Sequence, residues 1–175
     1  MNCYYFLDMV INKEQRVGVF VDVQNMYYSA RALYNSRVNF KEILKEAVKG
    51  RKLVRAIAYA VKAGEKEEEG FHNALSAIGF EVKLKELQIF YGGNKKADWD
   101  VGLAIDAIEL APKLDVVVLV SGDGDYLPLV EHLRRALGCK VEVLAFGRSC
   151  SGKLKEIADE FYDLDEKNFV FGPKR

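Results

Sequence analysis

The 175-residue chain has few of the residues that cross-link a fold, bind zinc or span a membrane. It has three cysteines and no CxxC pair, so neither a disulfide framework nor a zinc cluster is indicated. Two histidines are too few and too scattered for a histidine-based metal site. No apolar run reaches the roughly 18 residues of a membrane span, and the N-terminal residues lack the pattern of a signal peptide. We therefore expect a protein of the cytoplasm with no membrane partner.

Proline is also scarce, at three residues, whereas half of the chain is hydrophobic and 30% is charged. This composition excludes a disordered or collagen-like chain and fits one ordinary soluble domain. We expect that domain to cover residues 16–165. Residues 1–15 would then form an N-terminal extension and residues 166–175 a C-terminal tail.

Net charge is absent as well, because 26 basic residues balance 26 acidic ones. The balance excludes a uniformly basic nucleic-acid coat but allows a local basic patch. Residues 37–96 hold 13 basic and 8 acidic side chains, whereas residues 97–132 hold 1 basic and 8 acidic side chains. Such an acidic stretch is either a solvated surface or a set of carboxylates gathered around a cation.

The hydrophobic pattern predicts strands that alternate with helices. Short apolar runs indicate strands at 16–22, 52–61, 80–86, 115–121, 139–146 and 160–164. Helical spacing indicates helices at 25–34, 40–49, 65–78, 98–111, 125–137 and 151–159. This alternation gives right-handed βαβ crossovers, and therefore an α/β fold with a mainly parallel sheet. Such sheets bind ligands at the carboxyl ends of their strands.

Acidic side chains follow the two most apolar of these strands. Asp22 ends the first strand and is followed by Asn25, and Ser121-Gly-Asp123-Gly-Asp125 follows the fourth strand. Helix capping alone can explain each of these carboxylates. If the two strands are neighbours in the sheet, however, three carboxylates and an amide meet at one rim.

The helix predicted at 98–111 carries three more carboxylates on different faces. At about 100° per residue, Asp98 and Asp106 share a small polar stripe, whereas Asp100 projects with the apolar stripe toward the sheet. A carboxylate in that place is costly unless it is paired or binds a cation. We therefore expect Asp100 to belong to the site, with Asp98 as a helix cap and Asp106 as a surface or supporting residue.

Carboxylates that lie close together raise one another's pKa values, a penalty that a divalent cation removes. Oxygen ligands favour Mg²⁺ or Mn²⁺ over zinc, and such a cation commonly completes its shell with water and substrate phosphate. The chemistry implied is hydrolysis of a phosphodiester bond. Asn25 would hold the attacking water or a phosphate oxygen.

The order of these motifs resembles the NYN domain, a family of the PIN-like ribonuclease superfamily, and within it the LabA-like prokaryotic branch. The residues that carry the resemblance are Asp22, Asn25, Lys96, Asp98, Asp100, Asp106, Ser121, Asp123, Asp125 and Tyr126. The branch often has Phe where Tyr126 stands. The resemblance implies a Rossmann-like, three-layer α/β/α sandwich with a mainly parallel sheet of five or six strands. It also assigns metal ligation to Asp22, Asp100, Asp123 and Asp125, and a polar site role to Asn25.

Lysines and tyrosines next to the acidic motifs predict a path for RNA. Lysines follow phosphates, while aromatic rings stack on single-stranded bases. The alternative is that the lysines lie on a solvated face and the tyrosines in the core. The residues expected to bind RNA are Lys95, Lys96, Tyr27, Tyr28 and Tyr126.

We therefore expect a metal-dependent ribonuclease with Mg²⁺ or Mn²⁺ as cofactor and single-stranded or structured RNA as partner. Its catalytic residues would be Asp22, Asn25, Asp100, Asp123 and Asp125, with Ser121, Asp98 and Asp106 as supporting candidates. Two alternatives stay open: a catalytically silent RNA-binding or regulatory module, and a Mg²⁺-dependent phosphatase. A homodimer stays open too. A near match to a Walker A loop at 147–154 fails at Leu154, where Ser or Thr would bind the metal.

Overall fold

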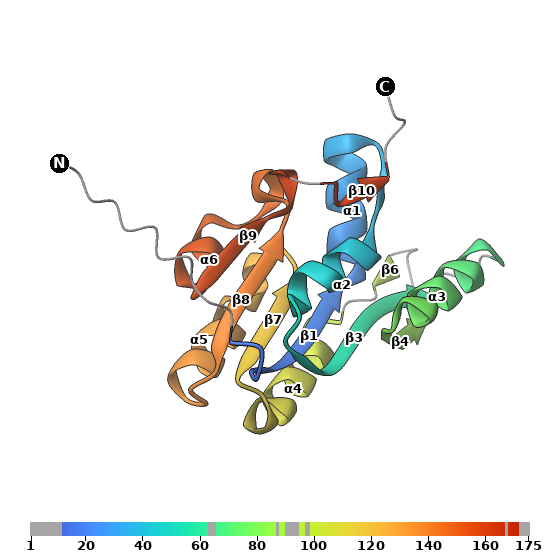
Figure 1. Cartoon of the computed structure of the whole chain (residues 1–175). Coiled ribbons are helices and arrows are strands. Elements are labelled where there is room, and N and C mark those ends of the chain that lie inside the picture. Colours follow the sequence, from blue (N-terminus) through green and yellow to red (C-terminus); the bar gives the residue numbers. More distant parts are fainter. Residues whose placement is uncertain are drawn as a thin grey trace.

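A six-stranded parallel sheet forms the centre of the protein (Figure 1). The computed structural model describes residues 12–62, 66–86, 88–89, 95–96, 99–166 and 168–171. In spatial order the strands are β4 (Glu81–Glu86), β3 (Lys52–Lys62), β1 (Arg16–Asp22), β7 (Val116–Val120), β8 (Lys140–Ala145) and β9 (Glu160–Asp163). The prediction of an α/β fold with a mainly parallel sheet is confirmed.

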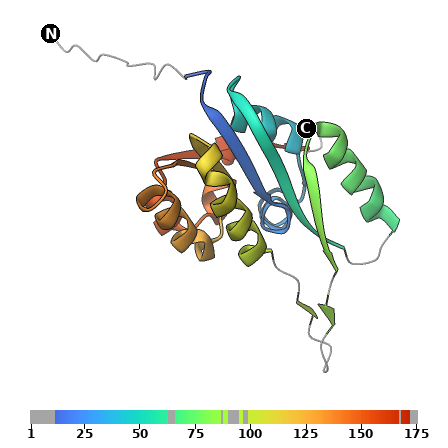
Figure 2. The same ribbon diagram turned by 90° about the horizontal axis from the view of Figure 1, so that it is seen from below.

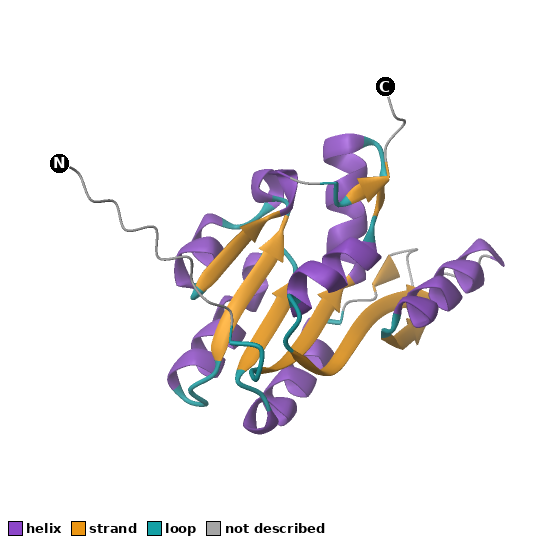
Figure 3. Ribbon diagram, viewed as in Figure 1, coloured by secondary structure: helices purple, strands orange, loops and turns teal. Residues whose placement is uncertain are grey.

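Helices cover both faces of the sheet and complete three layers (Figures 2 and 3). On one face lie α1 (Val23–Tyr34), α2 (Phe40–Val48) and α3 (Lys66–Ile78). On the other face lie α4 (Asp100–Leu110), α5 (Leu127–Arg135) and α6 (Gly152–Ile157). Each helical layer packs its buried side chains on its own face of the sheet, so the sheet separates two hydrophobic clusters.

The central strands are apolar throughout because both of their faces are buried. In β7, Val116, Val118 and Val120 face the layer of α1 and α2, whereas Val117 and Leu119 face the layer of α4 and α5. All five side chains are at most 2% exposed. Burial on both sides explains why a continuous apolar run, rather than an alternating one, marks this strand.

The helix boundaries follow local capping. Asn39 Oδ1 accepts the Glu42 N–H at 3.3 Å and starts α2 as its N-cap. The predicted helix at 125–137 is two elements: a 3₁₀ turn, η2 (Gly124–Tyr126), and then α5. Pro128 lies in the first turn of α5, where its missing N–H costs nothing. The remaining 3₁₀ turns are η1 (Ala111–Lys113), η3 (Gly147–Ser149) and η4 (Leu164–Glu166).

Two short antiparallel pairs were not predicted from the sequence. β2 (Arg37–Val38) pairs with β10 (Val170–Phe171), and β5 (Gln88–Ile89) pairs with β6 (Lys95–Lys96). Each strand has two residues, which is too short for a hydrophobic period to show in the sequence. In the described parts of the chain, no helix is both long and apolar enough to cross the lipid bilayer.

Candidate metal centre

Strands β1 and β7 lie side by side at the centre of the sheet. This is the condition under which their acidic loops were expected to meet. Their parallel register pairs Val21 with Val120, so Asp22 and Ser121 come next at the same carboxyl edge. Asp22 is 9% exposed, and its Oδ1 accepts the Asn25 N–H at 3.0 Å. Asp22 is therefore both the last residue of β1 and the N-cap of α1.

Asp100, the first residue of α4, meets Asp22 at a shared hydroxyl group. The Tyr126 Oη lies 3.2 Å from Asp22 Oδ2 and 3.0 Å from Asp100 Oδ1. Tyr126 is 1% exposed, so its ring is fixed in the core beneath the carboxylates. From the sequence we expected Tyr126 to stack on RNA bases, but a ring buried to this extent cannot do so. Its hydroxyl belongs to the acidic site instead.

Ser121 and Asp123 border this pair. The Ser121 hydroxyl, fully buried, lies 3.4 Å from Asp22 Oδ2 and accepts the Asp123 N–H at 3.2 Å. Asp123 Oδ1 accepts the Asp125 N–H at 3.0 Å and caps η2. The Asp123 charge is close enough to raise the pKa of Asp22.

Burial and like charges set the electrostatics of the pair. Burial is the main cause that raises the pKa of Asp22, and the neighbouring Asp100 and Asp123 charges raise it further. Hydrogen bonds from Asn25 and Tyr126 act in the opposite direction. Burial also raises the pKa of Tyr126, as do both carboxylates, so its phenol stays protonated at neutral pH. The centre therefore combines carboxylates that are poorly solvated with a neutral hydrogen-bond donor, the Tyr126 hydroxyl.

Asn25 links α1 to the loop after β7. Its Oδ1 accepts the Gly122 N–H at 2.9 Å, so the side-chain amide joins the two segments. Close packing favours glycine at position 122, because a Cβ there would lie 3.0 Å from the Cα of Cys150. Ser151 N–H donates to Gly122 O at 2.9 Å. The loop at 147–154, the near match to a Walker A motif, is thus hydrogen-bonded to the acidic loop that follows β7.

Several predicted site residues lie elsewhere. Asp125 is exposed at the rim. Asp106 lies apart, where its Oδ2 accepts hydrogen bonds from Tyr59 Oη and Lys83 Nζ, both at 2.7 Å. Burial alone would raise the pKa of Asp106, but the contacts with Lys83 and Tyr59 bring it below its ordinary value. Asp98 and the side chains of Lys95 and Lys96 lie outside the described residues.

The donor set fits a cation held by two carboxylates. Among the residues that the structure describes, no group of three or more His, Cys, Asp or Glu side chains could hold a metal ion. The centre is instead a converging pair, Asp22 and Asp100, joined through one hydroxyl. Mg²⁺ is usually bound by one or two carboxylates together with water and substrate phosphates. The pair suits Mg²⁺ or Mn²⁺ in that manner.

The sequence analysis missed Trp99, which anchors the start of α4. Its Nε1 donates to Ala60 O at 2.8 Å, and its ring meets that of Tyr59 at 5.4 Å between centroids. Trp99 thereby fixes the start of α4, where Asp100 is the first residue, to β3. The sequence feature that could have drawn attention to Trp99 is its position, as the chain's single tryptophan, between two aspartates of the motif.

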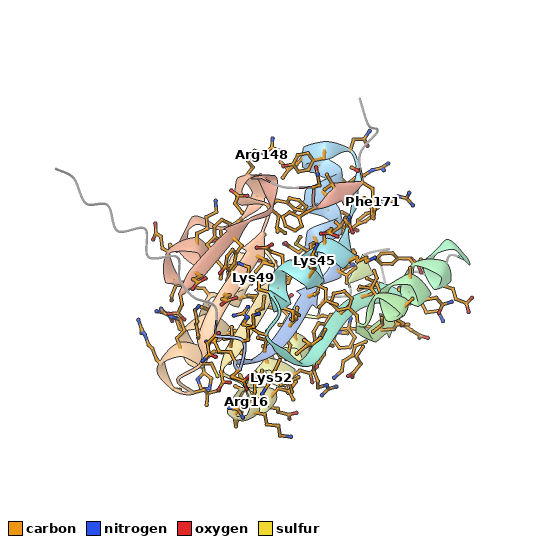
Figure 4. All side chains as sticks on the ribbon, in the orientation of Figure 1. Arg16, Lys45, Lys49, Lys52, Arg148 and Phe171 are labelled. Atoms are coloured by element: carbon orange, nitrogen blue, oxygen red, sulfur yellow. The ribbon has the colours of Figure 1, made fainter. Side chains whose placement is uncertain are left out.

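Arg148 is a cation at the same edge that was not among the predicted site residues. It follows β8 at the carboxyl edge, and its guanidinium lies 4.8 Å from the Tyr34 ring and 3.4 Å from Asp165. Figure 4 shows Arg148 at the end of the molecule opposite to Arg16 and Lys52, which begin β1 and β3. Of these three cations, Arg148 is therefore the one on the side of the carboxylates. Its place directly after a predicted strand was the available signal.

The fold and the site together define an α/β protein with an acidic centre at the carboxyl edge of a parallel sheet. The family model for the NYN domain matches residues 16–165, and the chain belongs to that family. It is 28% identical to the low amplitude and bright protein LabA of Synechococcus elongatus over 174 residues, which covers 90% of this chain and 89% of that protein. The resemblance noted from the motifs is confirmed.

A solved structure shows the same fold. It is the crystal structure of a protein of unknown function, VPA0982, from Vibrio parahaemolyticus, which is 38% identical in sequence with a TM-score of 0.85. The match covers 91% of this chain and 98% of that chain. The architecture described above is therefore shared by an experimentally determined relative.

Proposed function

We propose that this protein is a metal-dependent ribonuclease that hydrolyses RNA phosphodiester bonds at the centre formed by Asp22 and Asp100. One observation carries the proposal: two carboxylates from separate elements converge at the carboxyl edge of the sheet, where open α/β sheets bind their ligands. Membership in the NYN family supports a PIN-like nuclease or an RNA-binding module.

Asp22 and Asp100 would hold Mg²⁺ or Mn²⁺, with Asp123 beside them and Asp125 at the rim as further carboxylates. When bound, the cation lowers the pKa of a water molecule and stabilises the leaving oxygen. Asn25, fixed by Gly122 through its Oδ1, would direct its Nδ2 group to the substrate phosphate or the attacking water. The chain's own contribution is thus to place two anions and one donor around the scissile bond.

The aromatic surface next to this centre suits single-stranded RNA. Tyr27 and Tyr28 are 46% and 64% exposed and lie on α1 just after Asn25. Their rings meet edge to face with 5.4 Å between centroids, and we propose that these exposed rings stack on bases. Stacking on a ring of this kind contributes about 1–3 kcal/mol per base. Arg148, Lys95 and Lys96 are the proposed phosphate contacts.

A catalytically silent RNA-binding module is the second candidate. It is favoured by the small number of carboxylates that converge, two rather than the four that the family pattern assigns. Such a module would keep the exposed tyrosines and bind RNA without cleaving it. RNA affinity that falls steeply with salt is expected for both candidates, so affinity alone does not separate them.

Cleavage of a labelled single-stranded RNA with Mn²⁺ separates the two candidates. For the wild type we expect cleavage that EDTA abolishes. Asp22→Asn should lose cleavage and retain RNA binding, because the substitution removes a negative charge beside the phosphate but leaves Tyr27 and Tyr28 in place. Asp115→Asn is the matched control, since Asp115 pairs with Arg16 at the opposite end of the sheet, and it should cleave as the wild type does.

Three results would count against the ribonuclease. Binding without cleavage by the wild type, with several RNAs and with both Mg²⁺ and Mn²⁺, would establish the silent module. Cleavage that persists in Asp22→Asn would place the activity at another site. Turnover of a small phosphate ester with neither RNA binding nor RNA cleavage would indicate a phosphatase.

A further inference from the structure

We propose that Tyr126 is a positioning residue that sets the spacing of Asp22 and Asp100 for a divalent cation, an inference that rests on the proposed metal centre. The two carboxylates come from the end of β1 and the start of α4. The Tyr126 hydroxyl contacts both, at 3.2 Å and 3.0 Å. It is a direct link between them that neither backbone segment supplies.

The tyrosine is rigid enough for this role. Its ring is 1% exposed and packs in the cluster formed by α4, α5 and their face of the sheet. Tyr126 is the last residue of η2, and its backbone N–H donates to Asp123 O at 3.3 Å. Because its ring and its backbone are both fixed, the hydroxyl is a donor at one set position between the two carboxylates.

The hydroxyl spaces the pair without neutralising it. A phenol has one proton, so it donates to one carboxylate at a time, and the proton can alternate between Asp22 and Asp100. Both carboxylates therefore lie within hydrogen-bond distance of one common oxygen. Mg²⁺ and Mn²⁺ demand closely defined ligand positions, whereas Ca²⁺ accepts a wider and more flexible set. We infer that Tyr126 favours the smaller cations.

The chain offers a matched control for the test. Tyr59 is also 1% exposed, and its hydroxyl donates to an aspartate, Asp106, at 2.7 Å. Asp106 is bound by Lys83 and does not contact the Tyr126 hydroxyl. Tyr126→Phe and Tyr59→Phe therefore remove equivalent buried hydroxyls, one inside the proposed centre and one outside it.

The experiment is calorimetric titration of the full chain with Mn²⁺ and with Ca²⁺, alongside the melting temperature of each metal-free protein. For Tyr126→Phe we expect Mn²⁺ binding to weaken about tenfold, because a hydrogen bond to a charged group is lost, and Ca²⁺ binding to weaken less. Tyr59→Phe should lower the melting temperature while its Mn²⁺ affinity stays within about twofold of the wild type.

Unchanged Mn²⁺ affinity in a folded Tyr126→Phe protein would overturn the positioning role and leave the metal centre standing. Equal weakening in Tyr59→Phe would overturn it too, since the effect would then be a general loss of stability. An absence of Mn²⁺ binding to the wild type would instead remove the metal centre itself, and with it the proposed function. If Tyr126→Phe does not fold, Tyr126→Met provides a second comparison, because methionine also lacks the hydroxyl and its flexible side chain adapts to the space left in a core.

Discussion

At the scale of single residues, the surroundings give the aspartates of this chain opposite properties. Asp22 is buried beside other carboxylates, and its pKa is raised. Asp106 and Asp115 each have a cationic partner, Lys83 and Arg16, and their pKa values are lowered. The partner, rather than the residue type, thus separates the proposed metal ligand from the carboxylates that form ion pairs within the fold.

Asp115 gives a prediction about pH. Hydrogen bonds from the Arg16 side chain and backbone lower the pKa of Asp115 to about 2. A carboxyl pKa that is lower in the folded state stabilises the protein above the unfolded value of about 4, and this contribution is lost as the pH falls toward 2. We expect urea unfolding between pH 6 and pH 2 to show a steeper loss of stability for the wild type than for Asp115→Asn. Parallel curves for the two proteins would show that the ion pair does not contribute.

At the scale of elements, the sequence predicted the sheet closely but not how α4 begins. The predicted strand at 16–22 is observed at those residues, and the strand predicted at 115–121 is observed as Val116–Val120. Both are marked by their own apolar runs. Trp99 is the N-cap residue of α4, but its side chain makes no capping hydrogen bond. Instead, its indole donates to Ala60 O of β3, and this tertiary contact fixes the end of the helix. The place of Trp99 between two aspartates of the motif could mark the residue, but no local pattern encodes its contact with β3.

Gly102 tests the packing at that end. A Cβ at Gly102 would lie 2.7 Å from the Trp99 ring, whereas a Cβ at Gly70 in α3 would meet nothing within 4 Å. Ala is the better helix former by up to about 1 kcal/mol, and overpacking costs about 1–3 kcal/mol. In chemical denaturation we therefore expect Gly102→Ala to lower the free energy of unfolding by about 1–2 kcal/mol and Gly70→Ala to raise it by up to about 1 kcal/mol. Stabilisation by both substitutions would mean that Trp99 moves aside freely.

At the scale of the whole molecule, the strand order creates the site. Parallel pairing of β1 with β7 brings together Asp22 and the Ser121–Asp125 loop, and α4 adds Asp100 from the next layer. The motifs and the rule about carboxyl ends could predict which segments meet. They could not predict that Asn25 accepts from Gly122, or that Tyr126 turns inward to touch two carboxylates. Both contacts join residues far apart in sequence, so they depend on the final packing.

Thermal unfolding with Mn²⁺ tests most directly whether Asp22 and Asp100 form a cation site. A cation that binds the folded state alone, at a hundredfold excess over its Kd, should raise the melting temperature of a chain of this size by about 5–10 °C. Asp100→Asn should abolish that shift. Asp106→Asn should melt lower without metal, because Lys83 and Tyr59 lose their partner, yet keep the shift. The absence of a shift in the wild type, or an equal shift in wild type and Asp100→Asn, would contradict the account.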